Sequence, residues 1–125
     1  MSVKAVAKGV RMSPRKVGVV ASLVRGRTVD EALQILEHTP RRSAAAVRKV
    51  VASARANADH NHNLKPETLR IVSISVSPGP RLKRFRPAAH GRALPFQRRT
   101  SHIQVLVDGE LRAPKPAPKA AKKEA

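Results

Sequence analysis

The sequence predicts an α+β domain that carries a long, basic, two-stranded arm. Three helical segments follow one another in the first half of the chain, and strand-like runs lie before and after them. A third observation predicts the arm: 23 residues, 78–100, separate the last two strand-like runs, whereas a hairpin loop ordinarily has roughly two to five. At 125 residues the chain is expected to form one domain.

Residues 13–26 predict the first helix. Ser13 is suited to the N-cap and Pro14 to the first helical position. Apolar residues recur at i, i+3, i+4 and i+7 and define one face: Val17, Val20, Ala21 and Val24. Gly26 is suited to the residue after the C-cap.

Two further helices are predicted before residue 61. Thr28 and Glu31 have the spacing of a capping box, and Pro40 ends the helix that they begin. Its apolar side consists of Ala32, Leu33, Ile35 and Leu36. We expect Thr39 to cap the third helix, at about residues 41–60. An alanine-rich stripe lies along that helix: Ala44, Val47, Val51, Ala54 and Ala58.

Three runs predict strands. Residues 2–10 partly alternate between apolar and basic side chains, and the lysines suit a sheet edge. Residues 69–77 change parity near residues 71–73, which indicates a β-bulge there. Residues 101–107 are the expected partner of that strand, with Ile103, Val105 and Val107 on one face.

Composition points to a polyanionic partner. The formal net charge is +18, and charge of this density opposes compaction unless a polyanion neutralises it. Nucleic acid is the natural candidate. The chain has no Cys, which excludes disulfides and thiolate metal sites. No apolar run approaches the ~20 residues that span a bilayer, and the N-terminus lacks a signal peptide's apolar segment, so we expect a cytoplasmic protein without membrane contact.

The arm has no acidic residue: none occurs from residue 68 to 107. If its strands keep pairing, the midpoint falls near Ala89, and residues 88–91 make the turn with Gly91 at positive φ. Each leg then adds about 12 residues, or roughly 40 Å. Such a ribbon is marginal alone in water and needs something to lie in. Phe85 and Phe96 flank the tip and can stack on unpaired bases or fill apolar gaps in RNA. They can also pair with each other across the strands, which is compatible with RNA contact.

Three motifs resemble one family. Residues 79–93 followed by 98–103, "GPRLKRFRPAAHGRA" and "RRTSHI", resemble the hairpin tip and return strand of ribosomal protein twenty-two of the large subunit. "SPRKVGVVASLVRGRTVDEALQIL" and "SARANADHNHNL" resemble the helices of that family. The resemblance covers about residues 2–109, with the motifs in the family's order.

The resemblance implies three helices packed on a small antiparallel three-stranded sheet, with the hairpin threaded through large-subunit ribosomal RNA. It implies a structural role in the ribosome and in its assembly, several RNA domains bridged, and a tip that lines the nascent-peptide tunnel. The implied partners are that RNA, neighbouring ribosomal proteins and the nascent chain, with no homo-oligomer, cofactor, metal or catalytic residue. Ala88 and His90 depart from the family, which commonly has basic residues there, and "ALPF" replaces a more polar stretch. These departures predict a weaker positive field at the tunnel wall.

We therefore expect a globular RNA-binding part at residues 1–77 and 101–112, a hairpin arm at 78–100 and a disordered Lys/Pro/Ala tail at 113–125. The tip is expected at Ala88, Ala89, His90, Gly91, Arg92 and Ala93. The expected RNA contacts are Lys4, Lys8, Arg11, Ser13, Arg15, Lys16, Arg25, Arg81, Lys83, Arg84, Phe85, Arg86, Arg92, Phe96, Arg98, Arg99 and His102.

Three alternatives compete with this interpretation. A nucleoid architectural protein also inserts basic β-arms with a proline wedge into DNA, and Pro87 suits that role. Ser13 and Lys16 match the S-x-x-K pattern of acyl enzymes, but the motifs that complete it are missing, so an N-cap is the favoured interpretation. Residues 59–62, "DHNH", offer metal-ligand types at a spacing that converges poorly. We find no enzyme in the pattern.

Overall fold

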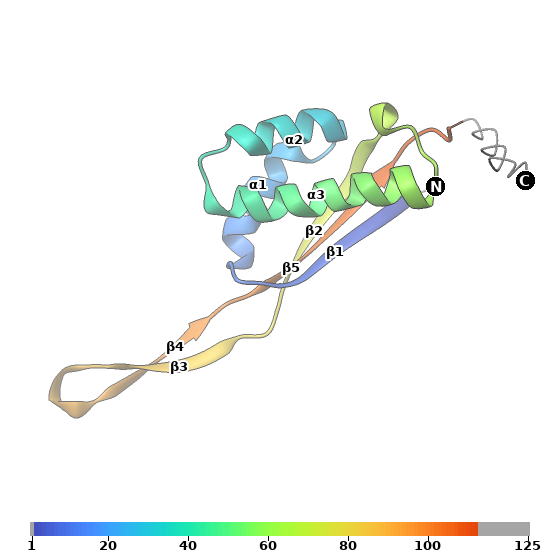
Figure 1. Ribbon diagram of the computed structural model, residues 1–125. Coiled ribbons are helices and arrows are strands. Elements are labelled where there is room, and N and C mark those ends of the chain that lie inside the picture. Colours follow the sequence, from blue (N-terminus) through green and yellow to red (C-terminus); the bar gives the residue numbers. More distant parts are fainter. Residues whose placement is uncertain (1, 113–125) are drawn as a thin grey trace, which may run out of the picture.

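Three helices cover one face of a three-stranded antiparallel sheet, and a two-stranded ribbon runs away from it (Figure 1). The computed structural model describes residues 2–112, so the predicted tail lies outside the described residues. The helices are α1 (Pro14–Val24), α2 (Val29–His38) and α3 (Arg42–Asn61). The strands are β1 (Ser2–Val10), β2 (Arg70–Pro78), β3 (Leu82–Pro87), β4 (Ala93–Arg98) and β5 (Ser101–Asp108). The predicted α+β class is confirmed.

The body, meaning the three helices with the larger sheet, has the strand order β1-β5-β2. The predicted edge position of β1 is therefore confirmed. β5 pairs antiparallel with both neighbours, and the register with β2 shifts between Ile71 and Ser73, where the parity change predicted a bulge. The shift turns both Ile71 and Ile74 toward the helices and leaves Val72 exposed.

The core lies between the sheet and the helices. All three predicted inward residues of β5 are buried, as is the whole predicted stripe of α3. α1 and α3 pack on the sheet, while α2 packs mainly on α3 and α1. In α2 only Ala32 and Leu36 of the predicted apolar side are buried, and Leu33 and Ile35 pack at the margin of the core. The core is built from small aliphatic side chains, as the lack of Trp and Tyr requires.

Local signals set most helix ends. Ser13 Oγ accepts a hydrogen bond from Lys16 N and Thr28 Oγ1 accepts one from Glu31 N, so both predicted N-caps are confirmed. Gly26 has φ +78, the left-handed conformation expected after a helix C-cap.

One predicted cap is wrong. The Thr39 hydroxyl donates to Ile35 O at 2.6 Å, so it binds the last turn of α2 instead of capping α3. The N-cap position of α3 is Arg41, whose side chain makes no capping hydrogen bond. A threonine hydroxyl can bond the carbonyl four residues back in its own helix, and here that local bond prevails.

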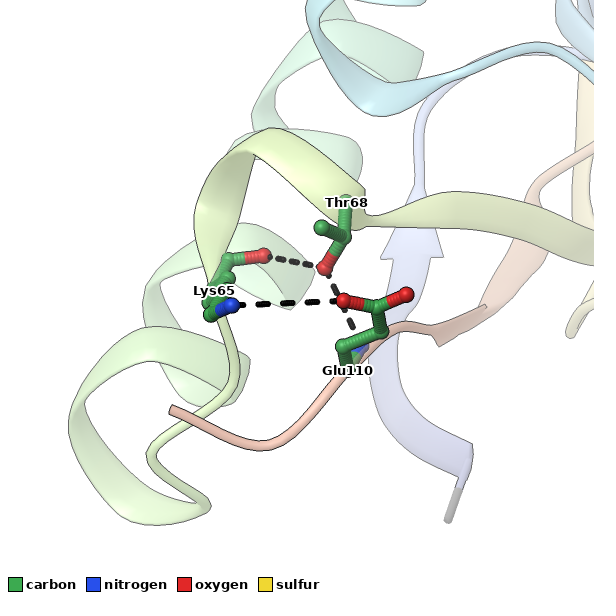
Figure 2. Close-up of polar contacts among 3 residues, drawn as sticks. All are labelled: Lys65, Thr68 and Glu110. Carbon is green, nitrogen blue, oxygen red and sulfur yellow. Dashed lines mark hydrogen bonds and ion pairs between the residues drawn. The ribbon is translucent and has the colours of Figure 1, made fainter. Parts of the chain in front are cut away.

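The end of the described chain is fastened at the far end of the body from the arm (Figure 1). Figure 2 shows the contacts between the 3₁₀ turn η1 (Pro66–Thr68) and the segment after β5. Thr68 Oγ1 donates to Lys65 O and accepts from Glu110 N, and Lys65 Nζ lies 4.0 Å from Glu110 Oε2. Arg112 Nη2 contacts Asp59 Oδ1 at 2.6 Å. These contacts hold the segment after β5 against η1 and the end of α3.

Candidate nucleic-acid interface

The arm, meaning β3, β4 and the turn between them, has two different faces. Residues directly opposite in the ladder share a face, and successive residues alternate between faces. The pairs Leu82–Arg98, Arg84–Phe96 and Arg86–Leu94 therefore form one face, here called the arginine face. The pairs Lys83–Gln97, Phe85–Pro95 and Pro87–Ala93 form the other, here called the phenylalanine face.

On the arginine face, Phe96 lies among guanidinium groups. The Arg86 and Arg98 guanidinium carbons are 5.1 Å and 5.5 Å from the centre of its ring. Both distances are in the range of cation–π contacts, which hold the guanidinium groups beside the ring. Phe96 is half-buried as a result, although the arm lies outside the body's core.

On the phenylalanine face, Phe85 has no such cover and is 73% exposed. Its cross-strand partner is Pro95, whereas Phe96 is opposite Arg84. The alternative in which the two phenylalanines pair with each other is therefore wrong. They point to opposite faces because they belong to adjacent rungs of the ladder. The sequence alone did not specify this register.

The tip is a tight turn at the predicted place. Ala88 N donates to Arg92 O at 2.8 Å, and Arg92 N to Ala89 O at 3.4 Å. Gly91 has φ +69, as expected, and His90 also has positive φ, +60, which was not predicted. The turn is centred on His90, one residue beyond the predicted midpoint.

The arm joins the body where the segment after β2 and the segment before β5 approach each other closely; this junction is called the crossing below. Gly79 N donates to Thr100 O at 2.8 Å, and the Thr100 hydroxyl donates to Pro80 O at 2.6 Å. A methyl group at Gly79 would lie 2.5 Å from Thr100 Oγ1. The strands therefore do not pair continuously from body to tip, because this crossing separates the β2–β5 ladder from the β3–β4 ladder.

A basic groove of about 590 Å³ lies beside this crossing. It is formed where the segment before α1, the start of α3 and the end of β4 meet. Its cationic lining residues are Arg11, Lys16, Arg41, Arg42, Arg98 and Arg99. No acidic residue lines the groove, and Ser13 caps α1 at its wall. The free N–H groups at a helix start add positive potential.

Sequence reasoning missed Arg41 and Arg42. Both precede or begin α3 and are exposed. The signal was present in the sequence as an adjacent pair of arginines at a predicted helix start, a position where cations are unfavourable for the helix itself. Only the folded body shows that they face Arg98 and Arg99, more than fifty residues later.

The other predicted contacts are distributed around this groove. Arg15 and Arg81 line a smaller hollow of about 160 Å³ at the crossing, whose lining also includes Gly79 and Thr100. Lys4 and Lys8 are exposed on β1, outside the groove. Arg92 is exposed beside the tip.

Two predicted contacts have structural partners. Arg25 Nη2 donates to Ile74 O at 3.0 Å and so covers part of the outer edge of β2. His102 Nδ1 accepts from Gly9 N at 3.1 Å, at the register shift between β1 and β5. His102 thus packs on the sheet.

The competing chemical motifs are accounted for by structural contacts. Ser13 is the α1 cap, and Asp59 of the "DHNH" stretch is paired with Arg112. Within residues 2–112, no group of three or more His, Cys, Asp or Glu side chains could hold a metal ion. The same part of the chain has no helix that is both long and apolar enough to cross a membrane.

Comparison with known proteins finds one family model and relatives that all have the same name. The profile of the family described as Ribosomal protein L22p/L17e matches residues 5–108. A protein named "Large ribosomal subunit protein uL22" from Clostridioides difficile is 55% identical over 107 residues, which cover 86% of this chain and 96% of the relative. The protein of the same name from Desulforamulus reducens is 54% identical, covering 86% and 95%. That from Herpetosiphon aurantiacus is 49% identical over 112 residues, covering 89% and 99%.

Proposed function

The chain belongs to the Ribosomal protein L22p/L17e family, and on that premise we propose that it binds large-subunit ribosomal RNA through the basic groove and the arm. Membership confirms the resemblance that the sequence predicted and makes the chain a structural protein of the large ribosomal subunit, not an enzyme. Its location is accordingly the large subunit in the cytoplasm.

The observation that carries the proposal is the continuity of the cationic surface. The basic groove has six cationic residues and no acid, and it opens beside an arm that is also free of acids. Every acidic residue between positions 2 and 112 lies in α2, near the end of α3, in η1 or around the end of β5. A surface on which cations are clustered in this way fits phosphates and releases their counterions on binding.

The body and the arm contribute in different ways. The division into a globular part at 1–77 and 101–112 and an arm at 78–100 is part of this proposal. The body binds phosphates with the groove, while the arm extends between RNA segments that are distant in sequence and so fixes their relative positions. An arm of this kind acts in assembly because RNA segments must fold around it.

The tip is proposed to line the nascent-peptide tunnel. Support comes from the tip motif that resembles the family, "RPAAHGRA", and from relatives that match over nearly their whole length. The residues concerned are Ala88, Ala89, His90, Gly91, Arg92 and Ala93. In this proposal the nascent peptide passes the tip, and neighbouring ribosomal proteins contact the body.

Ultraviolet crosslinking of the tagged protein in cells tests the RNA contact. We expect crosslinks from peptides within residues 81–99 to several separated segments of large-subunit ribosomal RNA. Crosslinks spread over chromosomal DNA, with ribosomal RNA at background, would instead support the nucleoid architectural function and overturn the proposal.

A pair of double variants tests the basic groove itself. We expect Arg41→Gln with Arg42→Gln to weaken binding to the large ribosomal RNA and to reduce the salt dependence, since each lost phosphate contact lowers the log–log slope by roughly 0.7–0.9. The matched control is Arg48→Gln with Lys49→Gln, the same charge change on α3 outside the groove. An equal reduction in the control would mean that overall charge, not the groove, is responsible.

A further inference from the structure

We propose that the two faces of the arm bind different parts of RNA: the arginine face contacts phosphates, and Phe85 on the opposite face stacks on an unpaired base. The inference rests on the proposed function, because it requires the arm to lie in RNA. It goes further by assigning a ligand class to each face and by separating the roles of the two phenylalanines.

Phe96 is not available as a stacking surface. Two guanidinium groups, those of Arg86 and Arg98, already lie 5.1 Å and 5.5 Å from its ring centre. The ring instead positions these arginines, which project from neighbouring rungs on the same face. Arg84 lies directly opposite Phe96, so the arginine face carries three arginines, two from β3 and one from β4, whose guanidinium groups suit phosphates.

Phe85 has the opposite surroundings. It is 73% exposed, and no part of the body covers it. The residues on its own face are Lys83, Pro87, Pro95, Ala93 and Gln97, and no cation within residues 2–112 makes a cation–π contact with its ring. Burial of so large and exposed an aromatic side chain by a partner would be strongly favourable.

The charges around Phe85 favour a base over a peptide as that partner. Lys83 shares its face, and the arginines of the opposite face add positive potential around the ribbon. An aromatic ring beside cations suits a nucleotide, which presents a flat π surface together with a phosphate. An apolar peptide segment would cover the ring but would gain nothing from Lys83 or from the positive potential of the arm.

The backbone around Phe85 has little conformational freedom to lose when the ring binds a base. Pro95 is directly opposite Phe85, and Pro87 is two residues along on the same face. Each proline fixes its own φ, so this part of the arm has fewer conformations to give up on binding. The side chain of Phe85 adds only two torsions, and a base can therefore be bound at low entropic cost.

The test is chemical probing of the large ribosomal RNA in purified large subunits that carry Phe85→Leu, Phe85→Tyr or Phe96→Leu. Acylation of ribose 2′-hydroxyls reports how freely each nucleotide moves. We expect one or a few unpaired nucleotides to become roughly fivefold or more reactive in F85L and to stay protected in F85Y, because only tyrosine retains a stacking ring. In F96L those same nucleotides should stay protected.

Two results would overturn the inference. One is an unchanged reactivity pattern in F85L. The other is equal reactivity in F85L and F85Y, which would show that the aromatic ring is irrelevant. If F85L left the RNA unchanged but altered crosslinks between the arm and a ribosome-bound nascent peptide, the phenylalanine face would contact peptide.

Ultraviolet crosslinking on the same subunits separates the inference from the proposed function. Crosslinks from residues 81–99 to the RNA, with unchanged nucleotide reactivity in F85L, would overturn only the stacking by Phe85. Absence of any such crosslink would overturn RNA binding by the arm as well.

Discussion

The body and the arm are parts of one chain that are stabilised by different means. In the body, helices and sheet bury a continuous apolar core. In the arm, no side chain between residues 81 and 99 is buried. A two-stranded ribbon of this kind is at best marginally stable in water. The body's conformation therefore follows from its own packing. The arm has no core of its own and, in the proposed function, is stabilised by a partner that neutralises and covers it.

The largest expected effect comes from reversing charge on the arm. Changing Lys83, Arg84 and Arg92 together to Glu should abolish incorporation into large subunits, because the arm would then repel the phosphates that it binds. Incorporation is measured by quantifying the protein in salt-washed subunits. The circular-dichroism spectrum of the purified variant should match that of the parent, since all three side chains are exposed. A lost helical signal would contradict the separation of body and arm.

A matched pair of leucines compares the two regions by stability. Leu69 is fully buried and Leu94 is 55% exposed. We expect Leu69→Ala to lower the free energy of unfolding by about 2–5 kcal/mol, because it leaves a cavity in the core. Leu94→Ala should change it by less than about 0.5 kcal/mol. Denaturant unfolding measures both, and similar costs at the two positions would show that the arm is packed like the body.

A pair of glycines tests the crossing between the regions. Gly79→Ala should cost about 1–3 kcal/mol, because the new methyl group meets Thr100 Oγ1 and the bonded backbone next to it. Gly18→Ala in α1 is the control: nothing lies within 4 Å of its added methyl group. It should therefore stabilise the helix by about 0.5–1 kcal/mol. If Gly79→Ala proved neutral in thermal unfolding, the crossing would not be a fixed junction.

The smallest expected effect concerns the α1 cap at the wall of the basic groove. Ser13→Ala removes the acceptor for Lys16 N and should destabilise the body by about 1 kcal/mol. Ser13→Asp keeps a capping acceptor, so its stability in denaturant unfolding should be close to that of the parent. Because the carboxylate adds negative charge to the groove, however, S13D should bind ribosomal RNA more weakly than S13A. The reverse order of RNA affinity would argue against phosphate binding there.

Local features were predictable from the sequence because their causes are local. The caps at Ser13 and Thr28, the stripe of α3 and the bulge after Ile71 each follow from residues a few positions apart. Thr39 was assigned wrongly because two local bonds competed for one hydroxyl, and the bond to Ile35 O prevails. The acid-free arm was predictable from composition and length alone.

The other features depend on contacts between residues that are far apart in the sequence. The rungs of the arm decide that Phe85 and Phe96 face opposite ways, and a shift of one residue would reverse that result. The basic groove requires the start of α3 to lie beside the end of β4, so Arg41 and Arg42 were missed. The hydrogen bond from Arg25 to Ile74 O could not be predicted either, because the two residues are distant in the sequence, and the RNA contact of Arg25 stays a prediction.

Amide hydrogen exchange, measured on the free protein and on large subunits, tests most directly whether a partner orders the arm. In the free protein we expect amides in residues 81–99 to exchange fully within seconds, while those of α3 and β5 stay protected. In the subunit the arm amides should become protected as well. Arm amides protected equally in the free protein, or unprotected in the subunit, would contradict the conclusion that the body folds by its own packing and the arm by binding RNA.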